Sequence, residues 1–300
     1  MTATPARRGG ALALGAALAA GALTGGVLAA PAASAAPAAP AAPAVPAAPA
    51  APAALARAEP LPPGLTFEDC PALPANADPS FWNCNVAVIA GGRLQVGKID
   101  QAITKPLRLT YAIGFDPETL EQQTLVVPLK GDPIRVDGGV LGIPGSDFLP
   151  ILQVSAKPEL AADPEFNIDP QTLLRLKLKV AVQNQLTGDT CAIGTKDDPV
   201  TLNLSIGTTN PPPPNKPITG SPPVDVSADP PTYKMTLVDN AFAAPKSTGC
   251  GPGGLFNGLV DWRSGLPAKA GTNTAIFEQY LTFKSYLELP ATLKRKALKK

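Results

Sequence analysis

The chain has 300 residues, 45% of them apolar, and a net charge of +1, because 25 lysines and arginines nearly balance 24 acidic residues. This balance carries no general signature of nucleic-acid binding. Histidine is absent, which excludes Ser-His-Asp and Cys-His catalysis and histidine-liganded metals within this chain. The 37 prolines argue against a helical bundle, because proline interrupts helices.

Residues 1–35 have the pattern of an export signal. Arg7 and Arg8 form a short positive region, residues 10–30 carry no charge, and residues 33–35 (Ala-Ser-Ala) supply the small side chains that a signal peptidase accepts. We therefore expect a secreted protein cleaved after Ala35, with no transmembrane segment once the signal is removed. An uncleaved anchor is the alternative, which the weakly apolar Ala and Gly content disfavours. The arginine pair leaves the twin-arginine export route open.

Residues 36–64 are predicted to be a disordered, Ala/Pro-rich spacer. Prolines recur at every third position from Pro37 to Pro52, and polyproline II has three residues per turn. Such a rod would hold a folded domain away from a surface or let it cross a cell wall. A disordered leader that only reflects a biased composition is the competing interpretation.

Four cysteines in an exported chain predict two disulfides. Pairing of sequence neighbours, Cys70 with Cys84 and Cys191 with Cys250, closes the smallest loops and is the pairing that we favour. A zinc site is rejected, because no two cysteines form a Cys-x-x-Cys pair and no histidine completes a ligand set.

Residues 65–293 are predicted to form a single β-rich domain. Alternation of aliphatic and basic residues is clearest at 174–182, where one face would be buried and the other exposed to water. The pair Gly91-Gly92 predicts a hairpin turn between strands at 85–90 and 93–96. Further strands are expected at 107–115, 124–129, 133–136, 200–206, 233–238 and 274–289, and a short helix at 255–262.

Many short strands with regular turn signals indicate an all-β fold, an antiparallel sandwich or a barrel-like domain. A second proline cluster near residues 210–231 is expected to be a long surface connection. It lies between Cys191 and Cys250, so the favoured disulfide would bind its two flanks together.

Three blocks, at 188–194, 199–204 and 207–217, read Gly-Asp-Thr-Cys-Ala-Ile-Gly, Pro-Val-Thr-Leu-Asn-Leu and Gly-Thr-Thr-Asn-Pro-Pro-Pro-Pro-Asn-Lys-Pro. With these blocks the chain resembles a group of uncharacterised secreted proteins of actinobacteria, in outline over residues 65–300. The resemblance implies export and an actinobacterial source. It implies no activity and no catalytic residue.

No catalytic set can be assembled from the sequence, and no cofactor or metal is predicted. Ser146 lacks the Gly-x-Ser-x-Gly frame and a base, so a surface turn is the better interpretation. A glycan hydrolase needs only two carboxylates, usually beside aromatic platforms, and Trp82 and Trp262 are the available tryptophans. Core packing is the more common role for both. Calcium at 197–198 or 225–229 is disfavoured, because no ligand run has EF-hand spacing.

The last seven residues, 294–300, form a basic tail with five positive charges. Such a block commonly contacts an anionic cell-wall polymer or a membrane surface, and a frayed, solubilising terminus is the alternative. The candidate contact residues are Lys294, Arg295, Lys296, Lys299 and Lys300.

Three functions from different classes fit these observations. The first is a secreted or cell-envelope-associated, non-enzymatic β domain with a binding or structural role. The second is a histidine-free extracytoplasmic glycan hydrolase that uses a carboxylate pair. The third is a carrier of an apolar ligand, which a lined internal cavity would favour and a solid core would exclude.

Overall fold

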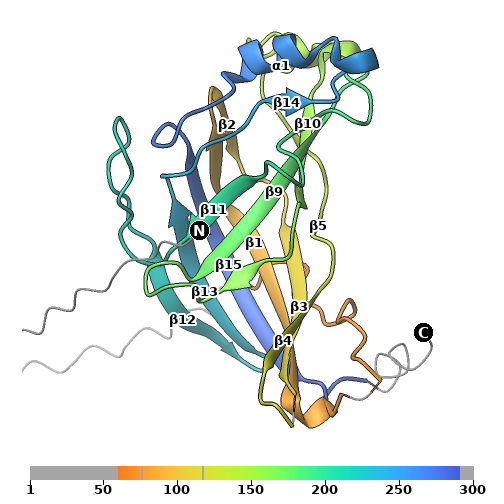
Figure 1. Ribbon diagram of the computed structural model, residues 1–300, viewed down its shortest axis with the longest axis vertical. Coiled ribbons are helices and arrows are strands. Elements are labelled where there is room, and N and C mark those ends of the chain that lie inside the picture. The colour runs from red at the N-terminus through yellow and green to blue at the C-terminus, as the bar shows by residue number, and fades with distance from the viewer. Residues whose placement is uncertain (1–59, 76, 117, 291–300) are drawn as a thin grey trace, which may run out of the picture. The chain divides into compact units, whose positions relative to one another are not determined.

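The computed structural model describes residues 60–75, 77–116 and 118–290, which form two antiparallel β-sheets packed face to face (Figure 1). The predicted all-β class is confirmed, and the fold is sandwich-like. Sheet A has the strand order β12 (Ser221–Ala228), β13 (Pro231–Asp239), β15 (Thr274–Ser285), β1 (Trp82–Val96), β3 (Leu107–Phe115) and β4 (Gln122–Val126), with β2 (Ile99–Ala102) paired to β1 and β5 (Lys130–Gly131) paired to β3.

Sheet B is centred on β9 (Leu174–Gln183), which pairs with four other strands. Its order is β14 (Ser247–Thr248), β10 (Ala192–Ile193), β9, β7 (Ser155–Leu160) and β6 (Ile134–Arg135), with β11 (Val200–Leu204) and β8 (Glu165–Phe166) also on β9. Helix α1 (Asn257–Ser264) lies at the end of the sandwich where β10 and β14 are found (Figure 1). Within the described residues, four short 3-10 turns are found, at Pro79–Phe81, Ser146–Phe148, Pro150–Leu152 and Pro252–Gly254.

The alternation of β9 sets the main core. Its aliphatic side chains are buried between the sheets, at Leu174, Leu176, Leu178, Val180 and Val182. The basic residues between them face outward, where Glu165 lies 3.0 Å from Arg175 and 2.7 Å from Lys177. The strand therefore has one apolar face and one charged face, as its period of two predicts.

A second core lies on the outer face of sheet A, beneath the segment that precedes β1. Residues buried there include Trp82, Cys84 and Tyr286. The Cys70–Cys84 disulfide ties the segment to β1, and the Tyr286 hydroxyl donates a 2.7 Å hydrogen bond to the carbonyl of Pro71. The middle of β1 is thus buried on both faces, which explains the apolar run at residues 86–90.

The hairpin predicted at Gly91-Gly92 is wrong. Both glycines lie inside β1, where the pairing with β15 shifts register between Ile89 and Gly91. Gly92 has a φ of 110°, and a Cβ atom there would overlap the carbonyl oxygen of Ile276. The glycines therefore permit a β-bulge, while the turn itself comes at Gly97-Lys98, between paired Val96 and Ile99.

The second proline cluster is only partly a connection. Residues 221–228 form β12, which is the edge strand of sheet A. An edge strand tolerates Pro222 and Pro223, because one side of its backbone needs no partner. The preceding loop is held by Asn215, whose amide donates to the carbonyls of Asn240 (2.9 Å) and Asn273 (2.7 Å).

The predicted strands at 107–115, 174–182, 200–206 and 233–238 correspond to β3, β9, β11 and β13, and 274–289 contains β15. The predicted helix corresponds to α1, which ends at Gly265 in the left-handed conformation. Strand β7 is not predicted from the sequence, because Lys157, Pro158 and Glu159 interrupt its alternation. The signal, most of the spacer and the basic tail lie outside the described residues.

Asp239 joins the two sheets at the end of β13. Its carboxylate accepts hydrogen bonds from the backbone N–H of Asn203 in β11 (2.7 Å) and of Ala241 (2.8 Å). Ser205 and Val238 exchange backbone hydrogen bonds beside it. Burial raises the pKa of Asp239, and the two backbone hydrogen bonds only partly oppose this rise.

We predict that Gly114→Ala destabilises the fold by about 1–3 kcal/mol, because the added methyl group would overlap the ring of Trp82. Gly258→Ala is the matched control. Nothing lies within 4 Å of a Cβ atom at Gly258 in α1, so this change should stabilise by about 0.5–1 kcal/mol. Urea unfolding measures both, and equal effects would contradict the packing of Trp82 on Gly114.

We also predict a pH-dependent difference between the wild type and Asp239→Asn. A carboxyl group with a raised pKa contributes stability that is present below its unfolded pKa and is lost as pH rises through the folded pKa. The wild type should therefore lose stability relative to the variant as pH rises from below the unfolded pKa of the carboxyl group through its raised folded pKa. Urea unfolding at stepped pH measures this difference, and a relative gain for the wild type would contradict the prediction.

Candidate ligand-binding cavity

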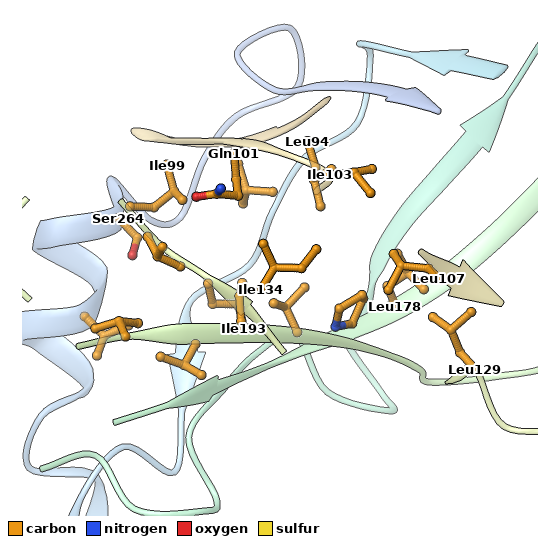
Figure 2. A pocket seen from close by; sticks show the side chains of 18 of the residues that line it. Leu94, Ile99, Gln101, Ile103, Leu107, Leu129, Ile134, Leu178, Ile193 and Ser264 are labelled. Atoms are coloured by element: carbon orange, nitrogen blue, oxygen red, sulfur yellow. The ribbon is translucent and has the colours of Figure 1, made fainter. Parts of the chain in front are cut away.

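A cavity of about 160 Å³ lies between the two sheets. One wall comes from sheet A, with Ala87, Ile89 and Leu109 among its residues, and the opposite wall comes from the inward face of β9. Protein interiors hold few voids larger than a water molecule. The aliphatic residues of β9 therefore do not complete a solid core but form the wall of an apolar space (Figure 2).

The lining is polar mainly at the end near α1. Figure 2 shows Gln101 and Ser264 toward the helix, whereas Leu107 and Leu129 lie at the opposite end. The residues that contribute polar groups to the lining are Gln101, Asn184, Thr187, Arg263, Ser264 and Gln279. An apolar chamber with a few polar groups at one end is the usual composition of a small-molecule site.

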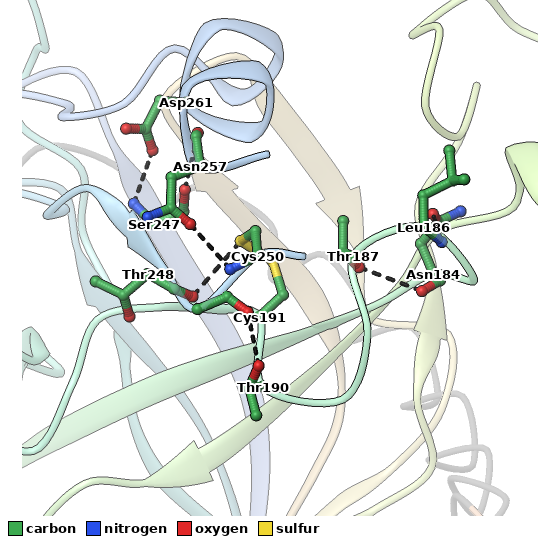
Figure 3. The surroundings of a disulfide bond; sticks show 11 residues. Asn184, Leu186, Thr187, Thr190, Cys191, Ser247, Thr248, Cys250, Asn257 and Asp261 are labelled. Atoms are coloured by element: carbon green, nitrogen blue, oxygen red, sulfur yellow. Dashed lines mark hydrogen bonds between the residues drawn. A yellow bond between two sulfur atoms is a disulfide. The ribbon is translucent and has the colours of Figure 1, made fainter. Parts of the chain in front are cut away.

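Helix α1 is fixed over this end by a disulfide and a polar network (Figure 3). Cys191, beside β10, is joined to Cys250 just before the helix. The Cys250 backbone N–H donates to the side-chain oxygen of Asn257 (2.9 Å), and the Ser247 N–H donates to Asp261 (2.7 Å). These contacts anchor both the first and the second turn of a helix that is too short to be stable alone.

The segment 138–152 borders the cavity beside α1. Its ends meet through the Val140 N–H, which donates 2.9 Å to the carbonyl of Leu152. Asn184 secures it further, because its amide donates to the carbonyls of Ile151 (2.8 Å) and Gln153 (2.7 Å). Gly139 and Val140 line the cavity. The segment and the helix thus form two sides of one end of the chamber.

Arg263 is the one charged residue in the lining, and no Asp or Glu accompanies it. A Cβ atom added at Gly142 would lie 2.5 Å from its Cζ atom and 2.6 Å from its Nε atom. The guanidinium group therefore packs closely against the backbone of the 138–152 segment at Gly142. Its Nε atom is buried and has no hydrogen-bond partner in the part of the chain that the structure describes.

Several exposed apolar side chains lie on the 138–152 segment, on or just before α1, and at Leu186, and we call them the apolar rim. Trp262 is 71% exposed, Phe148 73% and Leu255 74%. Lys98 lies over the Trp262 ring, with its nitrogen 5.9 Å from the ring centroid. The apolar rim consists of Leu141, Ile143, Phe148, Leu149, Ile151, Leu186, Leu255, Leu259 and Trp262. Leu186 and Leu259 also line the cavity, so the rim is continuous with its apolar interior.

The disulfides predicted from spacing are present, Cys70 with Cys84 and Cys191 with Cys250. Ser146 lies in a turn, where its hydroxyl donates 3.0 Å to the carbonyl of Gly138. Trp82 is buried against Gly114 and can offer no sugar platform. The anionic-surface contacts predicted for Lys294, Arg295, Lys296, Lys299 and Lys300 lie outside the described residues.

The cavity offers no pair of carboxylates, so it does not have the arrangement that a glycan hydrolase needs. Across residues 60–75, 77–116 and 118–290, no group of three or more acidic or cysteine side chains could hold a metal ion. In the same ranges no helix is long and apolar enough to cross a membrane.

Sequence reasoning missed the cavity, Arg263 and the apolar rim. One local signal was available, because the turn-rich segment 138–152 carries several large apolar residues that a surface loop does not need. The cavity itself had no such signal, since its walls come from strands far apart in the sequence.

Comparison with known proteins adds no relative. No family model matches the sequence, and neither a curated protein nor a solved structure matches it.

We predict that the two faces of sheet A differ in their tolerance of a larger side chain. Ala87 in β1 lines the cavity, whereas Ala112 in β3 is fully buried in the second core. Ala87→Leu should change the free energy of unfolding by less than about 1.5 kcal/mol, and Ala112→Leu should cost about 1–3 kcal/mol or more. Urea unfolding measures both. An equal loss of unfolding free energy in the two variants would show that the core at Ala87 is solid and would contradict the prediction.

Proposed function

We propose that this protein is a secreted or cell-envelope-associated, non-enzymatic binding protein that holds an apolar ligand between its two sheets. The observation that carries the proposal is the apolar cavity of about 160 Å³ between β1, β3 and β15 on one side and β7 and β9 on the other. An engineered apolar cavity of about 150 Å³ stays dry and binds benzene or xenon. The space is therefore large enough for one small apolar group or part of a longer ligand, the rest of which would extend toward the α1 end.

The energetic cost of the cavity supports a binding role over a structural one. Empty apolar space destabilises a protein by about 24 cal/mol per Å³, which is on the order of 4 kcal/mol for this volume. Domains of this size are stable by only about 5–15 kcal/mol. A ligand that fills the cavity would offset part of this destabilisation, because a ligand that binds only the folded state stabilises that state.

The apolar rim supports access from the α1 end. A monomeric protein rarely exposes a continuous group of large apolar side chains without a use for it. Phe148 and Trp262 lie on the two elements that border the polar end of the cavity. A poorly water-soluble ligand that passes between them stays in contact with apolar surface on its way in.

Export supports the location in this proposal. The signal predicted at residues 1–35 and the two disulfides both fit a protein that works outside the reducing cytosol. Both disulfides also serve the fold directly, since one secures the segment before β1 and the other secures α1 over the cavity.

Binding of N-phenyl-1-naphthylamine to the full chain with its disulfides formed tests the proposal. This uncharged dye becomes fluorescent in apolar surroundings. Ala156→Phe places a ring in the cavity and should weaken binding about tenfold or more, a loss of about 1.4 kcal/mol. Ala228→Phe adds the same ring on the exposed face of edge strand β12 and should leave binding unchanged.

The proposal fails if the wild type does not bind the dye, or if Ala156→Phe and Ala228→Phe bind it equally well. Circular dichroism of each variant confirms that the sheets are retained, so that a loss of binding reports on the cavity.

A further inference from the structure

We infer that the ligand is an anionic amphiphile, with an alkyl chain in the cavity and a carboxylate or phosphate head group on Arg263. This inference rests on the proposed function and names the chemical class of its ligand. It starts from an imbalance in the lining, which contains one cationic side chain and no anionic one.

Among the residues that the structure describes, Arg263 has no partner that would explain its position. None of the ion pairs in the described residues includes Arg263. The nearby acids have other partners, since Asp147 pairs with Arg135 at 2.7 Å and Asp261 accepts the Ser247 N–H. A buried guanidinium nitrogen that lacks an acceptor destabilises the folded state until an acceptor arrives.

Two other polar groups of the lining, on Asn184 and Thr187, cannot take over the role of Arg263. The Asn184 amide already donates to two backbone carbonyls, and the Thr187 hydroxyl donates 3.3 Å to the carbonyl of Asn184. These bonds hold the cavity border in place. Arg263 therefore supplies the strongest donor group left at this end, and it is held in position by Gly142 and by the anchored helix.

The chemistry of guanidinium selects the head group. Its planar set of N–H donors matches the oxygens of carboxylates and phosphates, and charge-assisted hydrogen bonds are about twice as strong as neutral ones. The rest of the cavity selects an alkyl chain, because its remote end is formed by aliphatic side chains such as Leu107 and Leu129. A ligand with both parts matches both ends of the site.

A head-group series on a constant alkyl chain tests the inference by calorimetric titration of the full chain below the micelle concentration. The ligands are lauric acid, dodecyl phosphate, methyl laurate and dodecyltrimethylammonium. Lauric acid or dodecyl phosphate should bind at least about tenfold more tightly than methyl laurate, and the cation should bind least well. The stronger of the two anions identifies the head group.

The variant Arg263→Gln should remove the preference for the anion, while methyl laurate should still bind. Arg263→Lys should restore part of the preference, because it restores the charge without the planar donor geometry. Arg175→Gln, which removes the same charge from the outward face of β9, should bind all four ligands as the wild type does.

Two results separate this inference from the function on which it rests. If the wild type binds lauric acid and methyl laurate equally, or if Arg263→Gln keeps the preference, the head-group inference is overturned and the apolar site stands. If the wild type binds neither methyl laurate nor either anion, both are overturned. Binding of methyl laurate by Arg263→Gln also shows that the variant has folded.

Discussion

The alternation of aliphatic and basic residues along β9 is the constraint on which the sandwich and its cavity depend. Its outward basic residues meet Glu165 and water, while its inward aliphatic residues face sheet A. Packed sheets lie about 10 Å apart, and side chains from both must fill that space. Near Ala87 and Ala156 they do not fill it, because these positions carry only methyl groups on opposite walls of the cavity. The small side chains make room that the larger neighbours of β9 enclose.

The end of the cavity depends on covalent and polar anchoring more than on apolar packing. Helix α1 has eight residues and buries only Ser264 fully. Its position follows from the Cys191–Cys250 disulfide and from the bonds of Asn257 and Asp261 to the chain before it. This arrangement leaves Leu259 and Trp262 on the surface and presents Arg263 to the cavity. The anchored helix thus places exposed apolar side chains and one cationic residue at this end of the cavity.

The correctly predicted strands are those whose own residues alternate between apolar and polar, so that the buried face can be identified without knowing the neighbouring strands. Residues 174–182 alternate strictly, so β9 is readable without any knowledge of its neighbours. The turn predicted at Gly91-Gly92 was wrong because a glycine pair is compatible with both a turn and a β-bulge. Only the close approach of Ile276 in β15 distinguishes the two structures. Strand β12 was hidden by its prolines, which are tolerated only because it has a free edge. The cavity could not be predicted, since its volume depends on how strands from both sheets are spaced.

The most direct test of the account is the location of a bound alkyl chain. Methyl-labelled protein with lauric acid should show intermolecular nuclear Overhauser effects from the chain to Ile89 of β1 and to Leu176 and Leu178 of β9, which line opposite walls. Contacts to both sheets would establish that the ligand lies between them. Contacts confined to the apolar rim, at residues such as Leu255 on the surface, would show that the interior is closed and would contradict the account.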